Sequence, residues 1–258
     1  MTRKNIYTLA ILLLSHYYQA LSQSGTPLPS GQISVRKTTD FAISGKGNAI
    51  NWSGAEWIRI EQRDSKTLRE NQWNIPKDRD NSRDLQYNTR FKIMYSEKGI
   101  YCLYSCEDSS ITATITEDFS HIYDEDVVEA FFWTDSAMPL YFEYELSPLN
   151  VELPILIVSN KGKIMGWKPW FYEGERKTIH AIHIDENRVA GKRFTWTAEF
   201  FIPFSLLNPL GNVPPAKGTK WRANFYRIDY DQKPVYSSWQ LTRQSYHDIE
   251  KFGTLVFE

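Results

Sequence analysis

The sequence predicts an all-β domain, an antiparallel β-sandwich with the two-sheet architecture of jelly rolls or immunoglobulin-like domains. Three observations lead to this prediction. Short runs of alternating polar and apolar residues recur between turn signals, Phe, Trp and Tyr make up 15% of the chain, and no long helical pattern follows the N-terminal segment. Aromatic side chains favour strands, and repeated short strands between turns are typical of sandwiches and jelly rolls.

The N-terminal segment, residues 1–22, has the pattern of a secretory signal peptide. Two basic residues precede a short apolar run from Ile6 to Leu14, and small residues follow at a cleavage point. The run is shorter than the roughly 20 apolar residues that a membrane-spanning helix needs. We therefore expect export to the periplasm, the cell surface or the medium, an extended lead-in over 23–39, and one β domain over 40–258.

Composition argues against several classes of function. The formal net charge is only −1, whereas a nucleic-acid partner would call for a basic patch. Cys102 and Cys106 are four residues apart on an expected strand, which places them about 13 Å apart and beyond the reach of a disulfide. We expect two buried free thiols. The sequence has no phosphate-binding loop, nucleophile elbow or metalloprotease helix.

Before residue 89 the strand signals are weak. Asp40–Gly45 predicts a short strand followed by a turn, and Trp52 and Trp57 lie in a stretch consistent with a strand. Residues 64–86 are rich in charge and Asn and lack apolar periodicity, so they predict a loop. We expect this loop to be an insertion within the single domain.

The regular strand signals begin at residue 89. Strands are predicted over Arg90–Tyr95, Ile100–Tyr104, Val127–Trp133, Leu140–Ser147, Trp196–Ile202, Trp221–Ile228 and Phe252–Phe257. The first two flank the turn Ser96–Gly99 and should form a hairpin. The third is an apolar run broken by Glu129, as expected of a strand that is covered on both faces. After the fifth strand, Pro203–Leu207 predicts a single helical turn with Pro at its start.

Three glutamates on these strands could carry chemistry. Glu143 and Glu145 share one face of their strand, with Cα atoms about 6–7 Å apart. Such a pair could act as the acid and nucleophile of a glycosidase, form a calcium site, or belong to a solvated strand face. Glu129 lies among apolar neighbours and needs hydrogen bonds, which either sugar hydroxyls or a structural ion pair with an Arg would supply.

The segment Gly166–Gly174 holds four aromatic residues between two glycines. A proline inside it argues against a central strand, so we expect a loop that displays Trp167 and Trp170 to a ligand. The alternative is that the loop folds down over one end of the sandwich. His180 and His183 lie three apart on an expected strand and face opposite sides, which makes joint metal ligation a poor interpretation.

Several segments, taken in order, resemble those of carbohydrate-binding module family 9. They are Asp40–Gly45 with the following Trp52, the hairpin Phe91–Tyr104, Tyr123–Phe131, Trp196–Pro203, Trp221–Asn224 and Tyr246–Gly253. The resemblance runs from about Asp40 to the C-terminus, with residues 64–86 and 154–192 as inserts. It implies a β-sandwich that clamps a sugar ring between two aromatic side chains while polar side chains read the hydroxyls.

The resemblance also implies roles for individual residues. Tyr123 and Tyr246 stand at the two clamp positions, where the family usually has Trp, and Glu129 matches the acid that accepts hydrogen bonds from sugar hydroxyls. Glu145 stands where the best-known members carry a basic residue. The expected ligand-binding set is Tyr123, Asp126, Glu129, Glu145, Asn224, Arg227 and Tyr246, with Trp167 and Trp170 as secondary candidates. A structural calcium ion is compatible with the resemblance, although no loop shows a specific ligand spacing, and no other cofactor is implied.

The sequence therefore predicts a non-catalytic carbohydrate-binding protein that supports polysaccharide capture or degradation. Its expected partners are a glycan or oligosaccharide and glycan-degrading enzymes, with no nucleic acid and no membrane span. Two alternatives stay open. One is an O-glycosyl hydrolase that acts on xylan-type glycans through Glu129, Glu143 or Glu145, and the other is a related sandwich that binds haem or a protein partner.

Overall fold

The computed structural model describes one compact unit that begins at Gly31 and ends at Glu258. The described residues are 31–62, 87–160, 163–186, 188–189, 191–208, 210–231, 234–242 and 245–258. The expected signal peptide and the loop over 64–86 lie outside these residues. The expected lead-in lies partly inside them, and it contributes a strand to the sheet.

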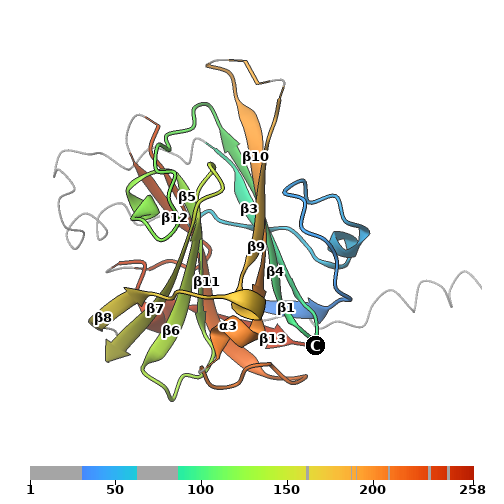
Figure 1. Cartoon of the computed structure of the whole chain (residues 1–258), viewed down its shortest axis with the longest axis vertical. Helices are drawn as coiled ribbons and strands as arrows, with labels where there is room; N and C mark the ends of the chain where they lie inside the picture. Colours follow the sequence, from blue (N-terminus) through green and yellow to red (C-terminus); the bar gives the residue numbers. More distant parts are fainter. Residues whose placement is uncertain are drawn as a thin grey trace, which may run out of the picture. The chain divides into compact units, whose positions relative to one another are not determined.

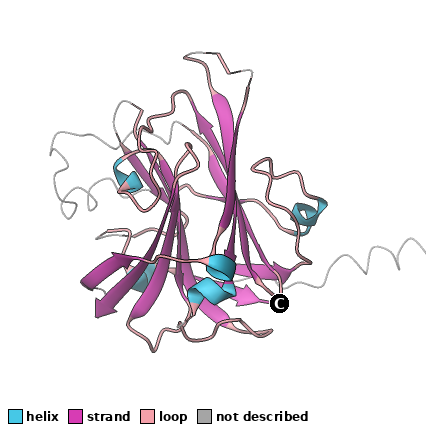
Figure 2. Ribbon diagram, in the orientation of Figure 1, coloured by secondary structure: helices cyan, strands magenta, loops and turns pink. Residues whose placement is uncertain are grey.

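Strands are the main regular structure of the described chain, and the helices are single short turns (Figures 1 and 2). The strands are β1 (Gln32–Lys37), β2 (Ile58–Arg59), β3 (Thr89–Tyr95), β4 (Gly99–Asp108), β5 (Val127–Trp133), β6 (Leu140–Leu146), β7 (Glu152–Asn160), β8 (Lys163–Pro169), β9 (Ile179–Ile184), β10 (Phe194–Pro203), β11 (Lys220–Asp229), β12 (Val235–Ser238) and β13 (Gly253–Phe257). The helical turns are α3 (Phe204–Leu207) and the 3₁₀ turns η1 (Ile50–Gly54), η2 (Ile122–Asp124), η3 (Gly174–Arg176) and η4 (Ile249–Lys251). The prediction of an all-β fold is confirmed.

The strands follow one another in the order β8-β7-β6-β5-β11-β13-β1-β3-β4-β10-β9, with β12 on β11 and β2 on β3. β1 joins the two halves of this sheet: its first residues pair with β13 and its last two pair with β3. Both of these pairings are parallel, whereas the others are antiparallel. The expectation of a purely antiparallel sheet is therefore wrong at β1, because this strand runs in the same direction as both of its neighbours.

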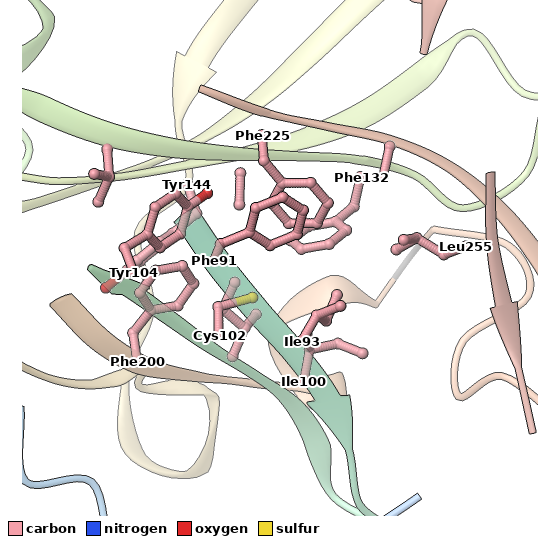
Figure 3. Close-up of a cluster of buried hydrophobic side chains, with 14 of the residues drawn as sticks. Phe91, Ile93, Ile100, Cys102, Tyr104, Phe132, Tyr144, Phe200, Phe225 and Leu255 are labelled. Atoms are coloured by element: carbon pink, nitrogen blue, oxygen red, sulfur yellow. The ribbon is translucent and has the colours of Figure 1, made fainter. Parts of the chain in front are cut away.

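The main core lies between the two halves of the curled sheet. Side chains from β3, β4 and β10 on one half pack against side chains from β5, β6 and β11 on the other, as Figure 3 shows. The rings of Phe91 and Phe225 stack across this core with their centroids 3.9 Å apart. Cys102 and Cys106 are buried here as free thiols, which confirms that prediction. Phe142 on β6 also faces this core, so Glu143 and Glu145 share the opposite face of the strand, as predicted.

A second core covers the other face of β5, β6, β7 and β11. It contains Phe131, Tyr141 and Tyr226 from the strands, and side chains from residues 115–123 and 246–252 pack over them. Both faces of β5 and β6 are therefore buried. This second core places the loops that precede β5 and β13 directly over the glutamates of β5 and β6.

Two N-terminal predictions differ from the structure. Asp40–Gly45 is irregular, and Trp52 lies in η1 instead of in a strand. The cause is Glu199 on β10, whose buried carboxylate accepts hydrogen bonds from the backbone N–H groups of Ser44 (2.9 Å) and Gly45 (2.8 Å) and from Trp52 Nε1 (2.8 Å). These donors bind a side chain and so do not enter a strand ladder.

Glu199→Gln is expected to lower the free energy of unfolding by about 1–3 kcal/mol. Every partner of the carboxylate is a donor, so an amide NH₂ group would face N–H groups and leave buried donors without an acceptor. Urea unfolding would measure the loss. Glu173→Gln, at an exposed position, serves as the control and should change stability by less than about 0.5 kcal/mol. Equal stability of both variants would contradict this account of the loop.

Candidate functional site

Three glutamates meet beneath the second core. Glu129 on β5 is the direct cross-strand partner of Glu145 on β6, and Glu143 lies two residues before Glu145 on the same face. The side chains are almost wholly buried, with Glu145 0%, Glu129 2% and Glu143 4% exposed. Like charges directly opposite each other destabilise a sheet, so this arrangement has to be compensated by protons or by a ligand. We call Glu129, Glu143 and Glu145 the acidic cluster.

Burial dominates the electrostatics of the acidic cluster. It raises the pKa of Glu143 to about 7 and the pKa values of Glu129 and Glu145 well above their usual range, and the neighbouring carboxylates raise the last two further. A hydrogen bond between Glu145 and Glu143 lowers the pKa of Glu143 and raises that of Glu145, as expected if Glu145 holds the shared proton. In the ionised form, both oxygens of Glu145 and Oε2 of Glu143 have no hydrogen-bond partner among the described residues.

His247 approaches the acidic cluster from the segment before η4. Its Nδ1 lies 2.6 Å from the hydroxyl of Tyr141 and 3.8 Å from Oε2 of Glu143. The ring also packs against Phe131, with centroids 5.2 Å apart. Burial lowers the pKa of His247 to about 4, so the imidazole is neutral at pH 7 and supplies no positive charge to the acids.

An aromatic surface adjoins the acidic cluster. Tyr123, in η2, is half-buried, and the raised pKa of its hydroxyl, about 12, is due to burial first and then to the charges of Asp124, Glu145 and Glu143. Its ring stacks on His121 at 5.2 Å, and the His121 ring meets the ring of Trp167 at 5.8 Å. Trp167 is 45% exposed. The structure thus brings Tyr123 and Trp167 into one region with Glu129 and Glu145.

Two of the predicted ligand-binding residues make structural hydrogen bonds instead. Asp126 is buried and accepts hydrogen bonds from the backbone N–H groups of Thr112 (2.7 Å) and Tyr230 (2.6 Å). The buried amide of Asn224 accepts hydrogen bonds from the N–H groups of Phe225 and Gln240 and donates one to the Gln240 carbonyl. Both side chains fix loops, and each of their polar atoms already has a hydrogen-bond partner.

Arg227 lies away from the acidic cluster. Its strand neighbour Tyr226 pairs with Glu129, so Arg227 points to the opposite face of β11. There its guanidinium binds the carboxylates of Asp108 (2.9 Å) and Asp229 (2.5 Å). The whole residue is only 1% exposed. The expected role of Arg227 in ligand binding is therefore replaced by a buried ion-pair network.

Tyr246 is held inside the second core. Its ring stacks on Tyr226 with centroids 4.0 Å apart, its hydroxyl donates to the carbonyls of Arg227 or Ser237, and it is 6% exposed. A sugar cannot stack on this ring without displacing Tyr226. The adjacent residue, His247, is the one that reaches the acidic cluster. Sequence reasoning missed it because an isolated His after an aromatic residue carries no pattern of its own.

The segment Gly166–Gly174 is not a simple loop, because its first residues belong to the edge strand β8. Pro169 ends that strand, and an edge position tolerates the missing N–H group. Trp170 packs against the main core and donates from Nε1 to the carbonyl of Leu206 (3.0 Å), so the alternative of a segment that folds down is the correct one for this residue.

Metal and membrane interpretations find no support in the described part of the chain. Within it, no group of three or more His, Cys, Asp or Glu side chains has an arrangement that could hold a metal ion. Likewise, none of the described helices has the length and hydropathy of a membrane-crossing helix.

Comparison of the sequence with known protein families gives a match. The sequence model of carbohydrate-binding family 9 matches residues 78–257. A relative from Arthroderma benhamiae, named extracellular protein, is 24% identical over 180 residues, which cover 66% of this chain and 78% of the relative.

Solved structures with the same fold are also found. A proposed carbohydrate-binding protein from Bacteroides uniformis is 19% identical with a TM-score of 0.66, and the match covers 88% of this chain and 99% of that one. A family 9 carbohydrate-binding module from Caldicellulosiruptor kristjanssonii matches in complex with glucose (TM-score 0.57, 16% identity, 88% and 95% coverage) and with cellotriose (0.56, 15%, 88% and 93%). At these identities the likeness shows the fold.

Proposed function

Because the chain belongs to carbohydrate-binding family 9, we propose that it is a non-catalytic carbohydrate-binding protein whose site is the acidic cluster together with Tyr123. The observation that carries the proposal is the pair of carboxylate oxygens on Glu145, which are fully buried and, once the acidic cluster is ionised, have no hydrogen-bond donor among the described residues. Hydroxyl groups of a sugar would supply the missing donors. The half-exposed ring of Tyr123 beside them offers an apolar face to the C–H groups of the same sugar.

Tyr123→Ala is expected to weaken sugar binding about five- to ten-fold, since aromatic stacking contributes about 1–1.5 kcal/mol. Isothermal titration calorimetry with a panel of mono- and oligosaccharides, glucose and cellotriose included, would measure this loss. Trp57→Ala is the matched control: Trp57 is also half-buried and aromatic, but it packs on β3 beside Arg90 and Lys92. Its affinity should equal that of the wild type.

Two outcomes would overturn the proposed function. One is that none of the sugars binds to correctly folded wild-type protein. The other is release of reducing sugar from the oligosaccharides, which would favour the hydrolase alternative, for which the raised pKa of Glu143 would suit a general acid. Tyr246→Ala is a poor probe of the clamp, because removal of this buried ring would disturb the second core.

The proposal extends to location and to biological role. We infer that residues 1–22 direct export and that the protein captures glycans outside the cytoplasm for glycan-degrading enzymes. The signal-peptide pattern of the sequence supports this inference, as does the name of the Arthroderma benhamiae relative. We also propose that the two halves of the sheet act as the two layers of the sandwich that the family resemblance implies, with the acidic cluster on the outer face of one layer.

A further inference from the structure

The acidic cluster lacks a positive partner. None of its three carboxyls forms an ion pair with a Lys or Arg side chain in the part of the chain that the structure describes, and the one nearby base is the neutral His247. Other buried acids of this protein are compensated differently. Asp108 and Asp229 share Arg227, and Glu199 accepts several N–H groups. The acidic cluster thus gathers three buried carboxylate oxygens, Oε1 and Oε2 of Glu145 and Oε2 of Glu143, that in the ionised form have no hydrogen-bond donor among the described residues.

The chemistry of the surroundings restricts what that group is. The titratable side chains that face the acidic cluster are Tyr226 from β11, Tyr230 just after β11, Tyr141 from β6, Tyr123 and Asp124 from η2, and Tyr246 and His247 from the segment before η4. Their hydroxyls are largely engaged: Tyr226 donates to the Tyr246 carbonyl and Tyr141 contacts His247. When it is ionised, the acidic cluster therefore presents hydrogen-bond acceptors and negative charge, and few hydrogen-bond donors surround it.

We propose that the preferred ligand is a sugar that carries a free, positively charged amino group, such as a 2-amino-2-deoxyhexose, with the ammonium group placed against Glu145 and Glu143. This inference rests on the proposed function and names its substrate class. An ammonium group brings three N–H donors and the opposite charge, so it satisfies the unpartnered oxygens in a way that a neutral hydroxyl does not. Its binding would displace the protons that the buried carboxyls hold in the free protein, and those protons pass to the buffer.

The test is calorimetric titration of the full chain at pH 7 with glucosamine, glucose and N-acetylglucosamine. The three sugars share one ring, and only glucosamine carries a charge. We expect glucosamine to bind about ten- to hundred-fold more tightly than the other two, the range that corresponds to one hydrogen bond to a charged group. Repeating the glucosamine titration in two buffers of different ionisation enthalpy should show proton release, and this readout needs no variant.

Matched variants localise the effect. Glu145→Gln should lose most of the preference for glucosamine, because the amide keeps the shape of the side chain and removes its charge. Glu152→Gln is the control: Glu152 is equally buried, but it accepts a hydrogen bond from Tyr144 at 2.7 Å on the opposite face of the sheet. It should keep the wild-type preference.

The inference and the proposed function fail in distinguishable ways. Glucose or N-acetylglucosamine binding as tightly as glucosamine, or a preference that survives in Glu145→Gln, would overturn the amino-sugar inference and leave carbohydrate binding intact. The absence of binding by all three sugars and by their oligomers would overturn both.

Discussion

Arg227→Ala should lower the free energy of unfolding by about 3–5 kcal/mol, which is the cost of removing one partner from a buried ion pair. The guanidinium Nη2 lies 2.9 Å from Asp108 and 2.5 Å from Asp229, and Nη1 donates to Thr89 and to the carbonyl of Glu107. Alanine would leave two buried carboxylates without a counter-charge. Urea unfolding monitored by tryptophan fluorescence would give the loss directly.

Two comparisons make this prediction specific. Arg59→Ala removes an exposed arginine that pairs with Glu61 at 2.9 Å, and exposed ion pairs are worth about 0–1 kcal/mol. The second comparison is ligand affinity, which we expect to be unchanged in folded Arg227→Ala because the side chain points away from the acidic cluster. Unchanged stability with lost sugar binding would restore the role that the sequence resemblance implied for Arg227.

The second large effect is a fall in stability as the pH rises from about 4.5 to about 7, on the order of a few kcal/mol. Burial raises the pKa values of Glu143 and Asp126 to about 7, whereas the unfolded chain has ordinary carboxyl pKa values near 4. The folded state therefore binds more protons than the unfolded state between about pH 4 and pH 7. The stability that these two acids contribute is fully present below about pH 4 and is lost as the pH rises to 7, at about 1.4 kcal/mol per group for each pH unit.

His247 opposes this fall over part of the window. Burial lowers its pKa to about 4, so the unfolded state binds the extra proton between pH 4 and 6.5, and there the histidine makes stability rise with pH. Several acids outweigh this single histidine, because burial also raises the pKa of Asp229 to about 6 and the pKa values of Glu129 and Glu145 well above their usual range. Glu129 and Glu145 lower stability with rising pH throughout the window, so the net slope is downward.

Urea midpoints at a series of pH values would test this pH dependence. Glu143→Gln should make the fall between pH 4.5 and pH 7 less steep, because the amide does not titrate, and the control Glu152→Gln should retain the wild-type slope. A profile that is flat in the wild type, or that rises with pH, would show that the acids of the cluster are ionised without cost in the folded protein.

The alternation of polar and apolar residues along the chain was sufficient to predict the strands in the middle of each half of the sheet. The hairpin of β3 and β4, the two faces of β6, the helical turn α3 and the free thiols all follow from local patterns. β7 and β8 were missed because Pro154 and Pro169 interrupt their patterns, and prolines in a sheet are acceptable only where the ladder allows them. β1 was missed because its partners are remote.

The site was predictable only in part, for a different physical reason. Period-two alternation placed Glu143 and Glu145 on one face, and the register then brought Glu129 opposite Glu145. Their burial depends on which loops pack over that face, and the sequence pattern of a strand holds no information on that. For the same reason it could not show that Tyr246 packs beneath Tyr226 while His247 reaches the cluster.

The parallel strand β1 has a consequence for how the chain acquires its structure. Gln32 pairs with Thr254 and Val35 with Phe257, so the strand that joins the two halves is completed by residues more than 200 positions away. Contacts of such separation carry a large loop-closure entropy and slow the folding of β proteins. The main core, which includes Leu255 and Phe257, cannot close until the residues of β13 have been synthesised, and the growing chain must keep the unpaired edges of β1 and β11 from other strands until then.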